Sequence, residues 1–207
     1  MTLAPSNIRE CPACKKPVEQ LVLNSGNTFG AVQWSDGFLA APMLPEFPRL
    51  GRCPHCATLF WVPEATLVGD CWPPDIAASQ WPGAKTVEGP TAEEFLSAIP
   101  LCGGDKEKEL FVRLRSWWRS NDRFRKGVAD APPFSETERG NLEELAEALD
   151  DAHPHHTVMR AEIARELGQF EQCLALLERD FGEELMYVVG TIRDRALDLD
   201  PKVMELK

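Results

Sequence analysis

The chain has 207 residues, of which 43% are hydrophobic, and it carries a formal net charge of −11 at pH 7. This length and apolar fraction are enough for one or two folded domains. The acidic balance argues against a general nucleic-acid-binding protein, because binding to phosphates requires a positive surface. No apolar stretch is long enough to cross a bilayer, and the first residues lack the pattern of a signal peptide. We therefore expect a soluble, cytoplasmic protein with reduced thiols and no membrane partner.

Two similar four-residue units lie in the first third of the chain, Cys11-Pro12-Ala13-Cys14 and Cys53-Pro54-His55-Cys56. Each places two thiolates near one centre, and a pair of such units supplies the four soft ligands of a tetrahedral zinc site. A redox-active dithiol is the alternative, but it usually stands alone at the start of a helix. Iron uses the same four ligands, so the sequence does not decide between zinc and iron. Because four cysteines leave no open coordination position, we predict a structural metal held by Cys11, Cys14, Cys53 and Cys56.

The 38 residues between the two units have the pattern of β-structure. Apolar runs at residues 18–23, 29–35 and 38–41 are strand candidates, and residues 59–62 follow the second unit as a last strand. Asp36-Gly37 separates two of these runs and is a strong signal for a two-residue hairpin turn. The order of unit, strands, unit and strand resembles the zinc-ribbon or rubredoxin-like family over about residues 8–64, although the long insert departs from it. The resemblance implies a small, zinc-stapled antiparallel β module.

Aromatic residues are dense in this module, and three of them are candidates for a partner-binding face: Trp34, Phe38 and Trp61. The alternative is that a small β domain buries them in its core. Alternation along a strand sends neighbours such as Phe60 and Trp61 to opposite faces, so one of the two faces needs to be covered.

Residues 69–104 are interrupted by Pro and Gly and contain Trp72 and Trp81, which is typical of a connector. Thr91 followed three residues later by Glu94 predicts a helix start, and this short helix should end near residue 98. Cys71 and Cys102 are single cysteines, and a thiol-dependent enzyme is the hypothesis that would use one of them.

A basic segment follows, in which residues 105–126 carry eight basic and four acidic groups. Apolar residues at helical spacing predict an amphipathic helix over residues 105–121. Basic residues interleaved with Trp and Phe are typical of a single-stranded nucleic-acid site, but a core helix with Trp in its seam is the favoured interpretation. Arg115 and Arg119 are candidate partner-binding residues. The basic side chains along the segment are Arg113, Arg115, Arg119, Arg123, Arg125 and Lys126.

The last part of the chain is acidic and helical in pattern. After a break at Ala131-Pro132-Pro133, Ser135 to Glu138 predicts a helix cap. His153-Pro154-His155-His156 suggests a second metal site, but Pro154 also fits the first turn of a helix. Over residues 154–201, small residues on one helix, then Gly168-Gln169-Phe170, Cys173 and Leu177 resemble the tetratricopeptide helical hairpin. That resemblance implies binding of a protein partner, and a small helical bundle is the alternative.

Together these features predict an α+β protein with a zinc-stapled β module at residues 1–68, a connector at 69–104 and an α-helical, tetratricopeptide-like domain at 105–207. The arrangement resembles bacterial cytoplasmic proteins, a likeness that brings no known activity with it. No nucleotide-binding, protease or hydrolase motif is visible. The predicted function is a non-enzymatic, zinc-binding adaptor between proteins. The alternative is a nucleic-acid-associated factor that uses the ribbon face and residues 113–126.

Overall fold

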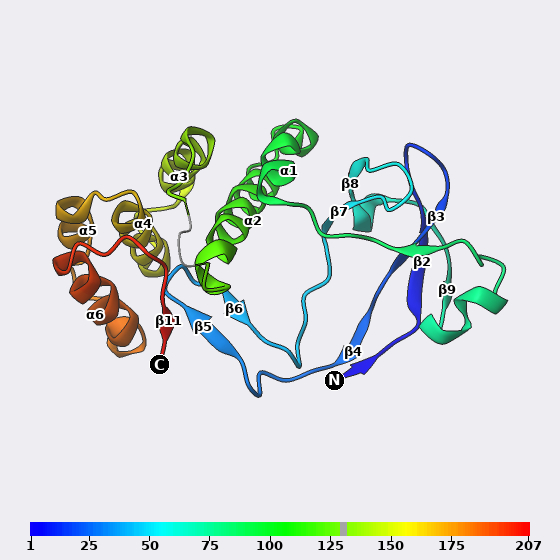
Figure 1. The fold of residues 1–207 in the computed structure, drawn as a ribbon, viewed down its shortest axis with the longest axis horizontal. Coiled ribbons are helices and arrows are strands. Elements are labelled where there is room, and N and C mark those ends of the chain that lie inside the picture. The colour runs from blue at the N-terminus through cyan, green and yellow to red at the C-terminus, as the bar shows by residue number, and fades with distance from the viewer. Residues whose placement is uncertain (129–131) are drawn as a thin grey trace. The chain divides into compact units, whose positions relative to one another are not determined.

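The computed structural model describes residues 1–128 and 132–207, so Ala131 of the predicted break lies outside it. The α+β class is confirmed: short strands fill the N-terminal part, and the C-terminal part is mostly helical (Figure 1). The chain forms two compact units. Unit 1 comprises Met1–Ala31 and Ala40–Glu94, and unit 2 comprises Val32–Leu39 and Phe95–Lys207. The domain boundaries at residues 68 and 104 stay a prediction.

Unit 1 is built from short strands in a four-stranded sheet of order β10-β3-β2-β9 and two two-stranded sheets, β1-β4 and β7-β8. Strand β2 pairs with β3 and β9 in antiparallel fashion, whereas β10 pairs with β3 in parallel. The module is therefore antiparallel except at one edge. The strands are β1 (Thr2–Leu3), β2 (Ser6–Glu10), β3 (Pro17–Gln20), β4 (Leu23–Ser25), β7 (Leu50–Arg52), β8 (Leu59–Trp61), β9 (Leu67–Cys71) and β10 (Lys85–Thr86).

The core of unit 1 surrounds two of the cysteines, with Val18, Phe60, Val62 and Val87 packed against Cys11 and Cys53. Gly51 is needed here for a close approach, because a Cβ at this position would lie 2.2 Å from Val87 Cγ1. Phe60 and Trp61 are 5% and 8% exposed, so both faces of β8 are covered.

The predicted connector contributes directly to the sheet of unit 1, since β9 and β10 form its two edges. The predicted start of a helix at Thr91 is confirmed: the Thr91 amide donates to Glu94 Oε2 at 2.9 Å, and the Glu94 amide donates to Thr91 Oγ1 at 3.2 Å. The short helices of this region are η2 (Pro73–Ala78), α1 (Ala92–Ser97) and η3 (Ile99–Cys102), and η1 (Val62–Glu64) precedes it.

Unit 2 is a set of packed helices with clear capping signals. Asp105 caps α2 by accepting from the amides of Glu107 and Lys108, and α2 runs four residues beyond the predicted end at 121. Ser135 and Glu138 form the capping box that the sequence predicted for α3. The long helices are α2 (Lys106–Arg125), α3 (Glu136–Ala148), α4 (Pro154–Glu166), α5 (Phe170–Leu176) and α6 (Glu183–Leu197).

A hairpin is present at Asp36-Gly37 as predicted, and it joins β5 (Val32–Trp34) to β6 (Leu39–Ala40). The predicted two-residue loop is wrong, because the Gly37 amide donates to the Trp34 carbonyl and the Trp34 amide donates to the Phe38 carbonyl, both at 2.9 Å, so the loop has three residues. Gly37 has φ +80, as the last residue of such a three-residue loop requires. The C-terminal strand β11 (Glu205–Leu206) adds to β5 in antiparallel fashion, with Glu205 opposite Trp34. Neither this strand nor the position of residues 32–39 in the helical unit was predicted from the sequence.

Two apolar clusters hold the helices of unit 2 together. One packs α4, α5 and α6 around Cys173, Leu177 and Ile192, all of which have essentially no exposed surface. The other packs α2, α3 and α4 around Trp117 and Leu145. The helical hairpin predicted from residues 154–201 is present as α4 and α5, and Gly168 between them has φ +80. Among the described residues, no helix combines the length and apolarity needed to span a bilayer.

Candidate metal centre

The four predicted ligands lie at the tips of two antiparallel hairpins. The first Cys-x-x-Cys unit connects β2 to β3, and the second connects β7 to β8. The two tips share one backbone geometry: Lys15 and Ala57, each directly after the second cysteine, both have φ +61. The amides of Lys15 and Ala57 donate to the carbonyls of Cys11 and Cys53 at 3.0 and 2.9 Å. This repeated turn directs both thiols of each unit toward one point. The strands that precede the two units, β2 and β7, were not predicted from the sequence.

The two tips meet, so that the four Sγ atoms of Cys11, Cys14, Cys53 and Cys56 all lie within 4.8 Å of one another. Cys11 Sγ lies 3.8 Å from Cys56 Sγ, and Cys14 Sγ lies 3.8 Å from Cys53 Sγ. A tetrahedral metal with bonds of about 2.3 Å to sulfur requires sulfur atoms about 3.8 Å apart. The donor set and its spacing therefore fit a single metal ion with four thiolate ligands.

Neighbouring groups set the environment of these thiols. The His55 amide lies 3.4 Å from Cys53 Sγ, and its ring Nε2 donates to the Pro17 carbonyl at 3.0 Å, which ties the second tip to the first hairpin. Burial raises the pKa of the Cys53 thiol to about 12, whereas the hydroxyl and amide of Thr58 lower the pKa of the Cys56 thiol to about 6. Binding of a metal ion to these thiols releases protons, because the ligands are thiolates.

The cysteines outside the cluster are placed differently. Cys173 is buried in the helical core, and burial raises the pKa of its thiol to about 11. Cys102 is 5% exposed, and burial raises the pKa of its thiol as well. Cys71 is partly exposed on β9. A raised pKa disfavours the nucleophilic thiolate, so neither Cys102 nor Cys173 has the environment of a reactive thiol.

The histidine-rich segment forms a cluster of rings but not a second ligand set. The His153 and His156 ring centroids lie 4.8 Å apart, and Pro154 occupies the first turn of α4 as predicted. Among the described residues, the four cysteines form the only group of three or more potential metal ligands whose donor atoms lie close together.

The candidate partner-binding aromatics do not form one exposed face. Trp61 lies in unit 1 and is 8% exposed, so its indole contributes mainly to packing. Trp34 and Phe38 lie in unit 2 and are half-buried. The Phe38 ring packs edge-on against Trp118 at 5.5 Å, and the Arg125 guanidinium lies 4.4 Å from its centroid.

Most of the basic side chains on residues 113–126 pair with acidic groups of the same unit. Arg115 packs over the Trp118 ring at 4.8 Å, and Arg119 is 52% exposed. This pairing reduces the positive charge that the segment offers to a phosphate. The ion pairs join Arg113 to Glu109 and Glu144, Arg123 to Glu138, Arg125 to Asp36 and Asp122, and Arg119 and Lys126 to Asp122.

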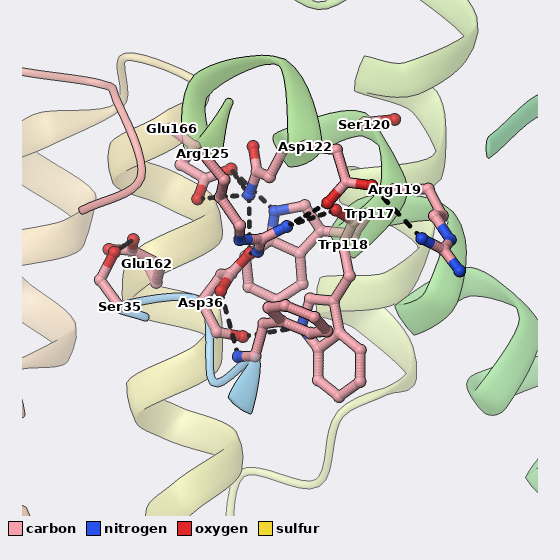
Figure 2. A network of polar contacts seen from close by, with 12 residues as sticks. Ser35, Asp36, Trp117, Trp118, Arg119, Ser120, Asp122, Arg125, Glu162 and Glu166 are labelled. Atoms are coloured by element: carbon pink, nitrogen blue, oxygen red, sulfur yellow. Dashed lines mark hydrogen bonds and ion pairs between the residues drawn. The ribbon is translucent and has the colours of Figure 1, made fainter. Parts of the chain in front are cut away.

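A buried polar cluster in unit 2 was not predicted from the sequence (Figure 2). It brings together the hairpin turn, α2 and α4, which are distant along the chain. The C-terminal tail contacts it, since the Asp200 carbonyl accepts from Arg165 and the Met204 amide donates to Ser35 Oγ. Because its members occupy ordinary helix and turn positions, only their burial identifies them, and no spacing in the sequence marks them. We call it the Asp36–Glu166 cluster, and it comprises Ser35, Asp36, Trp117, Asn121, Arg125, Glu162, Arg165 and Glu166.

Comparison of the chain with protein-family models, curated proteins and solved structures finds no match. Fold and site thus define the class of molecule: an α+β protein with a four-cysteine cluster that could hold a metal ion and a helical C-terminal region.

Proposed function

We propose that this chain is a non-enzymatic adaptor in which a structural zinc ion staples unit 1 and the helices of unit 2 bind a partner protein. The observation that carries the proposal is the convergence of four cysteine thiols with spacings of 3.8 Å across the two hairpin tips. Zinc is the metal that most often occupies closed four-thiolate sites of this kind, and such sites hold shape rather than perform chemistry. A small strand-rich unit gains most from this cross-link.

The helical part supports the adaptor hypothesis through its exposed apolar side chains. Helices α4, α5 and α6 follow one another and pack around one apolar cluster, and the resemblance to tetratricopeptide repeats implies that they form consecutive hairpins. On α6, Met186 and Leu197 are 65% and 63% exposed, although Leu185, Val189 and Ile192 on the same helix are buried. Exposed apolar residues beside a packed helix face are common where repeat proteins meet a partner.

A pull-down from cell lysate, with and without nuclease, tests this proposal. A protein partner that survives nuclease and is lost with Met186→Asp or Leu197→Asp is the expected result. Phe29→Asp is the matched control, because Phe29 is 85% exposed but lies in unit 1. Retention of the same partner by both α6 variants would contradict a role for this helix.

The second candidate is a nucleic-acid-associated factor, and the stacking of Arg115 on Trp118 is the observation that favours it. Its affinity for single strands should fall steeply with salt and with Arg119→Glu. Binding that is absent, or that does not depend on salt, would remove this candidate. The internal ion pairs of α2 are the reason that we rank it second.

A further inference from the structure

The Asp36–Glu166 cluster holds more buried acid than base. Asp36, Glu162 and Glu166 are 0%, 0% and 4% exposed. Among the described residues, two guanidinium groups contact this set, those of Arg125 and Arg165. Three carboxyl groups therefore share two buried cations, and an unpaired buried carboxylate is costly in a medium that cannot solvate it.

Each of the two arginines forms an ion pair with one of the three acids, which leaves the third acid without one. Arg165 forms a two-bond pair with Glu162, with Nε donating to Oε2 at 2.8 Å and Nη2 donating to Oε1 at 2.6 Å. Arg125 donates to Asp36 Oδ2, and it also donates to the partly exposed Asp122 at 3.2 Å. Glu166 is the acid that remains without a direct ion pair in the described structure.

Glu166 is contacted instead by neutral donors from α2. Trp117 Nε1 donates to Glu166 Oε2 at 2.7 Å, and Asn121 Nδ2 lies 3.0 and 3.1 Å from its two oxygens. The same Asn121 nitrogen donates to Asp36 Oδ2 at 2.9 Å. One amide group thus links the carboxyl of α4 to the carboxyl of the hairpin turn.

Two polar atoms of the cluster are buried without a hydrogen-bond partner among the described residues, Asn121 Oδ1 and Arg125 Nε. Such groups are rare in folded proteins, so the hydrogen bonds of this cluster are incompletely matched. A proton on Glu166 would remove one negative charge from a set of three acids that share two cations.

We propose that Glu166 is protonated at neutral pH and that its ionisation is a switch that loosens the segment Val32–Leu39 from helices α2 and α4. When Glu166 loses its proton, a second negative charge appears on the far side of Asn121 from Asp36. Asp36 anchors the turn, since it accepts from the Phe38 amide at 3.1 Å and its carbonyl accepts from Trp118 Nε1 at 3.0 Å. Repulsion at Asp36 therefore acts on the whole segment.

The groups around Glu166 favour its protonated form. Burial, then the nearby Glu162 and Asp36, raise the pKa of Glu166 well above its ordinary value, and the Trp117 bond and Arg165 oppose them only in part. Burial raises the pKa of Asp36 too, against Arg125 and Asn121. The ionisable and charged groups nearest to Glu166 are Asp36 from the turn, Arg125 from α2, and Glu162 and Arg165 from α4. Farther out lie Cys173 from α5, Asp200 from the tail, and Arg139 from α3, which donates to the Leu167 carbonyl.

Amide hydrogen exchange of residues 32–39 in the full chain, read by mass spectrometry between about pH 5 and pH 9 and corrected for the intrinsic rate, tests the proposal. An acid that binds its proton more tightly in the closed state favours that state at low pH and loses this effect as pH rises. The closed-to-open ratio of wild type should therefore fall by up to about tenfold per pH unit above the ordinary pKa of Glu. Glu166→Gln, which keeps the shape without the charge, should make this fall smaller, and the part that remains belongs to Asp36, whose pKa burial also raises.

Glu162→Gln is a second test. It removes one of the acids that raise the pKa of Glu166 and leaves Arg165 without its partner, so it should lower protection at low pH and make the fall with pH smaller. Parallel profiles for wild type and Glu166→Gln across the range would overturn the proposal. A second measurement uses the wild type alone: the Trp117 indole N–H resonance should titrate with a midpoint well above 4.5. A resonance that does not move over this range would also overturn the proposal, even if Glu166→Gln failed to fold.

Discussion

Substitution of one buried cysteine should destabilise unit 1 and leave the stability of unit 2 unchanged. Cys53 is 1% exposed and lies in the core of unit 1, so Cys53→Ser removes a candidate metal ligand without adding bulk. We expect the variant to lose its metal and unit 1 to unfold, whereas unit 2 keeps its structure because its apolar cores lie elsewhere. Cys71→Ser is the matched control, since Cys71 is a cysteine of unit 1 outside the cluster.

The size of the effect follows from the loop that the metal closes. Cys14 and Cys53 have 38 residues between them and lie with their Sγ atoms 3.8 Å apart. Closing a loop of this length with a covalent cross-link stabilises the folded state by about 4 kcal/mol through chain entropy. A free energy of unfolding of about 5–15 kcal/mol is usual for a domain, so a loss of about 4 kcal/mol leaves a small, strand-rich unit near its unfolding threshold.

Hydrogen exchange by mass spectrometry resolves the two units in one experiment. Peptides that cover β2 and β3 should lose protection in Cys53→Ser and after chelation of the wild type, and peptides that cover α4 should not change. Unchanged protection of β2 and β3 in the metal-free protein would refute the reasoning, because unit 1 would then be stable without its cross-link.

Three further predictions concern single interactions. Arg125→Met leaves Asp36 buried without its cation, so it should lower the free energy of unfolding of unit 2 by about 3–5 kcal/mol in urea titrations. Arg119→Met removes an exposed ion pair and should lower the same free energy by less than about 1 kcal/mol. Equal effects of these two variants would argue against a buried charge network. Leu177→Ala should cost about 2–5 kcal/mol in the same assay and Leu197→Ala far less, because Leu177 is fully buried and Leu197 is 63% exposed; a small loss at Leu177 would indicate a loosely packed hairpin. Acidification should release the metal in a chromogenic chelator assay, because protons compete with the metal for the thiolates, and metal retention that does not change with pH would exclude thiolate ligation.

Much of the metal site and of the helical caps could be predicted from the sequence, because each depends on a few residues close together in the chain. Paired Cys-x-x-Cys units, Asp36-Gly37, and the caps at Thr91 and Ser135 all specify local backbone geometry through their own side chains. The class of fold followed from the change from strand-like to helical periodicity.

Features that depend on distant contacts could not be predicted in the same way. β9 and β11 are short and have little pattern of their own, so only their pairing with β2 and β5 defines them. The burial of both Phe60 and Trp61 likewise needed knowledge of what covers each face of β8. Arg125 and Glu166 look like surface residues in the sequence, and only tertiary packing places them in one buried cluster.

X-ray absorption spectroscopy at the metal edge, together with the metal content of the purified protein, tests the central claim most directly. The account predicts one metal ion per chain, zinc by our proposal, with a shell of four sulfur atoms at about 2.3 Å. A shell that contains nitrogen or oxygen, or a protein with no metal and with disulfides among Cys11, Cys14, Cys53 and Cys56, would contradict it.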